Sequence, residues 1–315
     1  MFSPAIALSL PSLLPLPVST PTSELDAARV PASASWLVHV DMEAFRRTSL
    51  WELLQKEMQS GEVDVDFDEL KMFEERFGFR PFEDVHSVTV AGRGEIGDDG
   101  LVLVETSDAL DAAMARLQQE PEYRSMRRGG YDLHSWEEDG RSQGAFYIHH
   151  LNSRRLVVVS ESESELTEGI DVLNGRAKSL RQNPDAMVIP RPTPGAFLFV
   201  DATAALSALA ELEPASAVAE MARGARVEIG ESRGELFLNV DIIANTPENA
   251  DNIYSVINGV RAFAAMAGAQ EDVPDFALEM LNSIEMQTTG SEVSLQFRYD
   301  ARELVEEIRA IEEAY

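Results

Sequence analysis

AFLFVD at residues 196–201 repeats the pattern of WLVHVD at residues 36–41. In both stretches an apolar segment typical of a β-strand ends in Val-Asp and leads into a helical segment. A segment that contains proline precedes each stretch. Since the two stretches open the two halves of the chain, they predict two related units in tandem.

The order of the elements that follow each stretch supports this interpretation. Paired strands are expected at 85–90 and 101–104 in the first half and at 226–229 and 235–243 in the second. In the first half, the closing strand is expected at 155–160, and the helix after it is expected to end at Gly175. In the second half, the closing strand is expected at 291–299 and the closing helix at 302–313. Residue identity between the halves is low, so the predicted duplication depends on the order of the elements.

The pattern of apolar residues also predicts the fold class. Alternation of apolar and polar positions is typical of antiparallel sheets that have helices on one side. The continuously apolar runs at 101–104 and 156–159 predict central strands. We therefore expect an α+β fold of two tandem, diverged units of mainly antiparallel sheet with helices packed on one face. The other face of each sheet needs a cover, from the partner half or from another protein.

Composition divides the chain into four parts. Residues 1–34 form a leader or signal-like segment, 35–175 the first α+β unit, 176–194 a proline-rich linker and 195–315 the second α+β unit. The leader has an apolar run and small residues at possible cleavage points, but no basic residue before Arg29. We expect a periplasmic or extracellular protein, with a cytoplasmic one as the alternative. No transmembrane segment is expected in the mature chain, because no stretch reaches the ~20 apolar residues of a membrane helix.

Overall charge and the absence of cysteine exclude several classes of protein. The chain has 315 residues, of which 26 are basic and 55 acidic, so its formal net charge is −29. Nucleic acids and anionic membranes are polyanions that such a chain repels, so neither is expected as a partner. Without cysteine the chain forms no disulfide, thiolate metal site or cysteine nucleophile.

Two glycine motifs match known functional patterns but stand in the wrong context. Residues 92–97 fit the GxGxxG dinucleotide pattern, which requires a helix after the loop. Residues 230–234 fit the GxSxG nucleophile elbow, which requires a strand-to-helix turn. Strand patterns flank both motifs on both sides, so both are predicted to be hairpin turns.

The best candidate metal site is the acidic run Asp64, Asp66 and Asp68, with Glu62 and Glu69 close by. Alternating aspartates supply the hard oxygen ligands that calcium prefers. The run fails as an EF-hand loop, because Glu69 stands at the sixth position, where glycine is needed. The alternative is a solvated acidic loop whose carboxylates interact favourably with the positive N-terminal end of the following helix. No cofactor is predicted.

The histidines provide one candidate catalytic pair. His39 and Asp41 share a face of the first strand, and a His–Asp pair can orient a general base. His149 and His150 are adjacent on a strand, so they point to opposite faces. No nucleophile is recognisable beside the pair, so no catalytic residue is assigned. Asp41 and its counterpart Asp201 are interpreted as caps or turn formers at matching strand ends.

Basic residues gather in and beside the linker, at Arg176, Lys178, Arg181 and Arg191. The doublet at 46–47 is another such feature. One interpretation is that these residues offset nearby acidic groups. The other is a basic groove between the halves, which would suit an anionic ligand.

Three short segments carry a resemblance to known proteins. They are PASASWLVHVD at 31–41, FGFRPFEDV at 77–85 and LNG at 173–175. On these segments the chain resembles a group of uncharacterised exported bacterial proteins, over about residues 30 to 312. The group has no assigned activity, so the resemblance implies export and transfers no site residue.

We expect a non-enzymatic, exported protein that binds a protein or a small ligand, or that has a structural role. One alternative is a hydrolase with its site between the two halves, and another is a calcium-stabilised structural module. A cleft between the halves, lined by His39, Asp41 or the linker arginines, would favour a ligand or a substrate. A closed junction with an exposed apolar sheet face would favour a protein partner.

Overall fold

The computed structural model describes residues 25–60, 67–94, 100–138, 141–183, 191–202, 215–268 and 280–312. Its strands are β1 (Trp36–Asp41), β2 (Val85–Gly92), β3 (Gly100–Ser107), β4 (Tyr123–Arg128), β5 (Tyr131–Glu138), β6 (Arg141–Leu151), β7 (Arg154–Ser160), β8 (Ala196–Ala202), β9 (Ala222–Ser232), β10 (Glu235–Ala244), β11 (Glu285–Thr289) and β12 (Glu292–Asp300). Its α-helices are α1 (Met42–Phe45), α2 (Ser49–Ser60), α3 (Phe67–Phe77), α4 (Pro81–Asp84), α5 (Ala109–Leu117), α6 (Glu163–Leu173), α7 (Ala215–Met221), α8 (Pro247–Gly268) and α10 (Ala301–Glu312). A 3₁₀ turn covers Leu180–Gln182.

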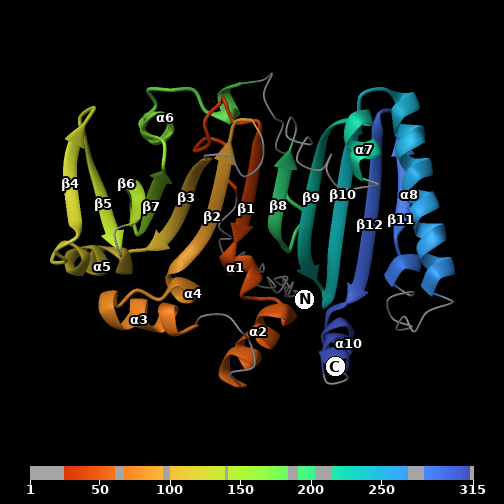
Figure 1. Ribbon diagram of the computed structural model, residues 1–315, viewed down its shortest axis with the longest axis horizontal. Coiled ribbons are helices and arrows are strands. Elements are labelled where there is room, and N and C mark those ends of the chain that lie inside the picture. The colour runs from red at the N-terminus through yellow and green to blue at the C-terminus, as the bar shows by residue number, and fades with distance from the viewer. Residues whose placement is uncertain are drawn as a thin grey trace, which may run out of the picture.

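All of these strands join one antiparallel sheet, and Figure 1 shows it across its whole width. Their order across the sheet is β11-β12-β10-β9-β8-β1-β2-β3-β7-β6-β5-β4. The α+β class and the mainly antiparallel sheet are therefore confirmed. β3 and β7 lie inside the sheet, as their continuously apolar sequences predict.

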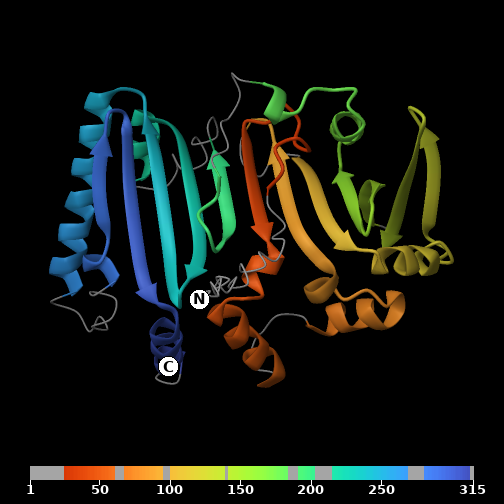
Figure 2. The same ribbon diagram turned by 180° about the vertical axis from the view of Figure 1, so that it is seen from behind.

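The two halves of the chain meet where β1 pairs with β8. In this pair Val38 lies opposite Val200, His39 opposite Phe199, and Val40 opposite Leu198. Outward from this junction the first half runs β1-β2-β3-β7-β6-β5-β4, and the second half runs β8-β9-β10-β12-β11. Figures 1 and 2 both show β1 and β8 side by side at the centre, so backbone pairing connects the halves into one sheet.

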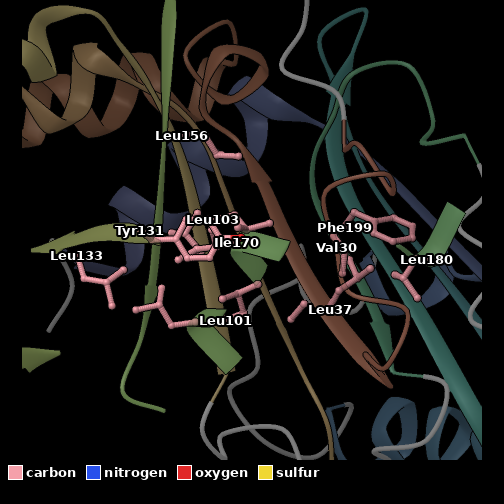
Figure 3. Close-up of a cluster of buried hydrophobic side chains, with 13 residues drawn as sticks. Val30, Leu37, Leu101, Leu103, Tyr131, Leu133, Leu156, Ile170, Leu180 and Phe199 are labelled. Carbon is pink, nitrogen blue, oxygen red and sulfur yellow. The ribbon is translucent and has the colours of Figure 1, made fainter. Parts of the chain in front are cut away.

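One face of the sheet, here called the Leu37 face, carries the main hydrophobic core (Figure 3). Helix α6 packs on it through Leu166 and Ile170, which are fully buried. The buried members of the core are Val30, Leu37, Ala91, Leu101, Leu103, Tyr131, Leu133, Leu156, Val158, Leu166, Ile170, Leu180 and Phe199. Val30 is 1% exposed, so residues 25–34, which the sequence groups with the leader, contribute to this core.

The opposite face, here called the Val38 face, is also apolar. At one end of the sheet α8 covers Ile242 and Val293 with its own buried residue Ile253. At the other end α3 and α5 pack around Phe77, whose ring lies 5.5 Å from that of Trp136. Half-buried side chains of the central strands lie between these two areas: Val38, Val40, Val88, Val90, Val102, Val104, Val200 and Val227.

The helices are thus divided between the two faces, whereas the sequence predicts them on one. The pairing registers from β1 through β8 and β9 to β10 place Leu37 and Ile242 on opposite faces. The physical reason is that both faces of the joined sheet carry aliphatic residues. Each face therefore gains by burying them under a helix.

Both glycine motifs lie between strands, as predicted. Residues 230–234 span the β9–β10 connection, where Arg233 and Gly234 have φ angles of 59° and 84°. Two consecutive positive φ angles are typical of a type I′ hairpin turn. The other motif begins at Gly92, the last residue of β2, and the next described element is β3. In the described part of the chain, the element that follows each motif is a strand, not the helix that the functional interpretation requires.

Candidate functional site

A cavity of about 390 Å³ lies beside the junction of the two halves. Its size falls within the roughly 300–1,000 Å³ of small-molecule sites. It is lined by Leu25, His39, Asp41, Ala44, Arg47, Thr48, Arg191, Pro192, Thr193, Pro194, Gly195, Ala196, Phe197, Leu198, Phe199 and Glu231. The lining is mainly apolar, with charged groups of both signs among the apolar residues. The structure therefore brings together four residues that the sequence singles out: His39, Asp41, Arg47 and Arg191.

Three short segments position the charged groups of the cavity. β1 alternates, so His39 and Asp41 both lie on the Leu37 face. The turn after α1 carries Arg47, because α1 ends at Phe45 and α2 begins at Ser49. The segment that leads into β8 carries Arg191. Strand, turn and linker thus meet at the same end of the β1–β8 pair.

The close approach of backbone segments shapes this end of the cavity. Gly195 has a φ of 93°, and a Cβ there would lie 2.3 Å from the carbonyl oxygen of Glu231. The backbone N–H of Glu231 donates to the carbonyl of Gly195 at 3.1 Å. A side chain at position 195 would both strain the backbone and separate these strands.

Asp41 is a buried carboxylate, with a 5% exposed residue surface. Its Oδ1 accepts a hydrogen bond from the backbone N–H of Ala44 at 2.9 Å, which makes it the N-cap of α1. Burial raises the pKa of Asp41, although the Ala44 amide and the charge of Arg47 act in the opposite direction. No described Lys, Arg or His forms a salt bridge with this carboxylate. The predicted role as a cap is confirmed.

His39 is also 5% exposed, and it is directed toward the neighbouring strand. Its Nδ1 lies 2.8 Å from Oγ1 of Thr89 on β2. The imidazole and the Asp41 carboxylate are therefore engaged with different groups. This arrangement differs from the His–Asp pair that would orient a general base.

Arg47 and Arg191 are exposed at the cavity, and neither forms a hydrogen bond or an ion pair with a described side chain. The adjacent Arg46 contrasts with them. Its guanidinium donates to the carbonyl oxygens of Phe82 at 2.7 Å and Val85 at 3.0 Å. Arg46 therefore holds α1 against α4, whereas Arg47 and Arg191 keep their donors available to a ligand.

Glu231 connects the second half to the start of α2. Its Oε2 accepts from the backbone N–H of Ser49 at 2.6 Å, and its Oε1 accepts from the Ser49 hydroxyl at 3.0 Å. A carboxylate in this position also interacts favourably with the positive end of the helix. Both of its oxygens are thus in use within the protein.

A second charged cluster lies under the segment before β1. Glu105, which is 7% exposed, accepts hydrogen bonds from Arg29 and from Arg154, the latter at 2.6 Å. Arg154 also bonds to Glu43 at 3.0 Å, and His86 Nδ1 lies 2.8 Å from the same Glu43 oxygen. The adjoining cavity measures only about 20 Å³, so this cluster is structural rather than a ligand site.

The predicted metal site lies outside the part of the chain whose side chains the structure describes. Asp64 and Asp66 lie outside the described residues, and Asp68 lies in α3 with its side chain outside them. Within the described part of the chain, no group of three or more His, Asp or Glu side chains is arranged to hold a metal ion. No helix of that part is long and apolar enough to cross a membrane.

No family model matches the sequence, and no curated protein matches it. The chain is similar to solved structures of TP0453. Crystal form III gives a TM-score of 0.48 at 10% identity, over 91% of this chain and 99% of that chain. Crystal form IV gives 0.49 at 9% identity, over 91% and 97% of the two chains. At these values the similarity assigns neither a function nor a site to this chain.

Proposed function

We propose that the protein binds a small organic anion with an apolar body in the cavity beside the β1–β8 junction. The observation that carries this proposal is the pair of guanidinium groups of Arg47 and Arg191. Both line a mainly apolar cavity, and neither is paired with a described residue. Guanidinium forms strong, directed hydrogen bonds with carboxylates and phosphates. A hydrolase receives less support, because His39 and Asp41 are engaged with Thr89 and Ala44.

Binding of 3-phenylpropionate, measured by isothermal titration calorimetry on the full chain, tests the proposal. We expect Arg47→Gln and Arg191→Gln each to weaken binding about tenfold, since a charge-assisted hydrogen bond contributes roughly 1.5 kcal/mol. Arg223→Gln is the matched control, because Arg223 is exposed and lies outside the cavity lining. Equal affinity in all of these variants, or no binding by the unmodified protein, would contradict the proposal.

We also propose that the two halves derive from a duplication. The corresponding residues of the two opening stretches, His39 and Phe199, face each other across the junction. On either side of them the pairs Val38–Val200 and Val40–Leu198 exchange equivalent positions. The matching order of the five strands next to the junction in each half supports the same origin, and β5 and β4 extend the first half beyond this match. Superposition of residues 35–175 on 195–315 tests it, since unrelated halves would not align strand for strand.

Export of the protein is a further part of the proposal, and it rests on the sequence alone. The apolar run and the small residues within residues 1–34 support a cleaved signal. Because Val30 belongs to the core, we expect cleavage before residue 25. Mass spectrometry of the protein recovered from a bacterial periplasm gives its N-terminus. An intact Met1 in protein confined to the cytoplasm would contradict export.

A further inference from the structure

We infer that the ligand of this cavity is a zwitterion, in which an ammonium group next to the anionic group binds the carboxylate of Asp41. This inference rests on the proposed function, because it concerns the same cavity and adds the second charge of the ligand. The ligand class that follows is a free amino acid or a short peptide end with an apolar side chain.

First, the cavity contains charged groups of both signs that form no salt bridge with a described residue. Arg47 and Arg191 offer guanidinium donors without a described partner. Asp41 offers a carboxylate of which one oxygen, Oδ1, is used by the Ala44 amide. A ligand that carries only an anion would bring a second negative charge close to Asp41, whose carboxylate already interacts with the charge of Arg47.

The second step concerns the cost of burying Asp41. Taking a carboxylate out of water is unfavourable, because burial disfavours the charged form. At Asp41 this effect of burial outweighs the opposing effects of the Ala44 and Glu43 amides and of the charge of Arg47. The raised pKa of Asp41 agrees with this condition. An ammonium group placed in the cavity would supply both a charge and up to three hydrogen-bond donors. Binding of a cation therefore relieves an unfavourable feature of the unliganded protein.

The third step distinguishes Asp41 from Glu231, the other carboxylate of the lining. Both oxygens of Glu231 accept hydrogen bonds from Ser49. Asp41 accepts from the backbone N–H groups of Ala44 and Glu43 but from no side chain of the described residues. It stands on the same strand face as His39, in the wall of the cavity. Asp41 is thus the better ammonium acceptor.

The apolar part of the lining accounts for the body of the ligand. Phe197 and Phe199 of β8 contribute aromatic surface, and Pro192 and Pro194 contribute rigid apolar surface. Phe199 is 2% exposed, so the wall it forms is fixed by the core behind it. A hydrophobic side chain of moderate size suits such a wall.

Three probes with the same phenyl group separate the contributions of the carboxylate and the ammonium group to binding. They are phenylalanine, which carries both groups, 3-phenylpropionate, which carries the carboxylate, and phenethylamine, which carries the ammonium group. We expect phenylalanine to bind at least tenfold more tightly than 3-phenylpropionate, and phenethylamine to bind more weakly than phenylalanine. Asp41→Asn should remove the difference between the first two probes, while binding of 3-phenylpropionate remains. Asparagine is as good an N-cap as aspartate, so α1 should persist in this variant.

Asp84→Asn is the matched control, since Asp84 is a buried aspartate bonded to Arg80 and Ser107 outside the cavity. This variant should leave the ratio of the affinities for phenylalanine and 3-phenylpropionate unchanged. Equal affinity for phenylalanine and 3-phenylpropionate would overturn the zwitterion inference and leave the proposed function standing. Loss of the ratio in Glu231→Gln but not in Asp41→Asn would overturn the assignment to Asp41. Absence of binding by all three probes would overturn both proposals.

Discussion

Truncation of Phe199 to alanine is expected to lower the free energy of unfolding by about 3–5 kcal/mol. Phe199 is 2% exposed and belongs to the main core. It also lies in β8 directly opposite His39, where the two halves meet. The substitution removes most of a buried aromatic side chain from a site with rigid strands on both sides, so the surroundings can close the resulting space only in part.

Urea unfolding followed by circular dichroism measures this loss. Phe263→Ala is the matched control, because Phe263 on α8 is 68% exposed, and its truncation should change stability by less than about 0.5 kcal/mol. A loss below 1 kcal/mol for Phe199→Ala, similar to that of the control, would mean that the junction is not packed as described.

Replacement of Glu105 by glutamine is expected to destabilise the protein by about 2–3 kcal/mol at pH 7. The change removes the carboxylate that the guanidinium groups of Arg29 and Arg154 share, and leaves Arg29 with Asp26 and Arg154 with Glu43. The effect should fall below that of a fully buried pair, because the side chains of Arg29 and Arg154 are 30% and 25% exposed. Thermal and urea unfolding of the two proteins measure the difference.

The pH dependence of this difference has a definite sign. Burial alone would raise the pKa of Glu105, but hydrogen bonds from Arg154 and Arg29 outweigh it and hold the pKa below the ordinary glutamate value. The contribution of Glu105 is therefore complete above the unfolded-state pKa of about 4.3 and is lost as the pH falls through the lower folded-state value. The gap between Glu105→Gln and the unmodified protein should narrow in acid.

Glu235→Gln provides the control for this series, because Glu235 is exposed and forms no ion pair with a described residue. It should neither destabilise the protein measurably nor alter the acid dependence. A gap for Glu105→Gln that stays constant from pH 7 to pH 3 would show that the ion pairs do not contribute through the charge of Glu105.

Local patterns in the sequence predict the elements that depend on local forces. The apolar pattern of residues 67–77, followed by Gly78 and Pro81, predicts a short helix, and α3 has these bounds. The paired strands and both hairpins are where the alternation places them. The strand β4 is missed, because it lies at the edge of the sheet and five of its six residues are exposed. An edge strand of this kind has no apolar alternation to detect.

The segment 42–59 shows where a local pattern misleads. Its sequence is amphipathic and typical of a helical segment, but the structure divides it, because α1 ends at Phe45 and α2 begins at Ser49. Between them the guanidinium of Arg46 bonds to carbonyl oxygens of residues 82 and 85, and the Thr48 hydroxyl accepts from the N–H of Trp51. Tertiary contacts and a new N-cap interrupt the helix, and the interruption places Arg47 at the cavity.

The sequence predicts only part of the site, because the site also depends on tertiary contacts. His39, Asp41 and Arg191 stand out by position and composition, and Arg47 stands out as part of a doublet. The contact of Glu231 with Ser49 joins residues 182 positions apart. No periodicity or motif encodes a contact over that distance, because it depends on the pairing of β1 with β8.

The junction of β1 and β8 has an evolutionary consequence. Antiparallel pairing of equivalent strands is the contact that a two-fold symmetric dimer of single units would use. On the proposed duplication, fusion replaced an encounter between two molecules with an intramolecular one at a high effective concentration. After fusion, equivalent positions of the two halves could also change independently of each other. Asp41 is now a cap in the cavity wall, whereas Asp201 is fully buried and pairs with Arg226 at 2.8 Å. A symmetric ancestor would have had two identical sites, and the fused chain could specialise one of them.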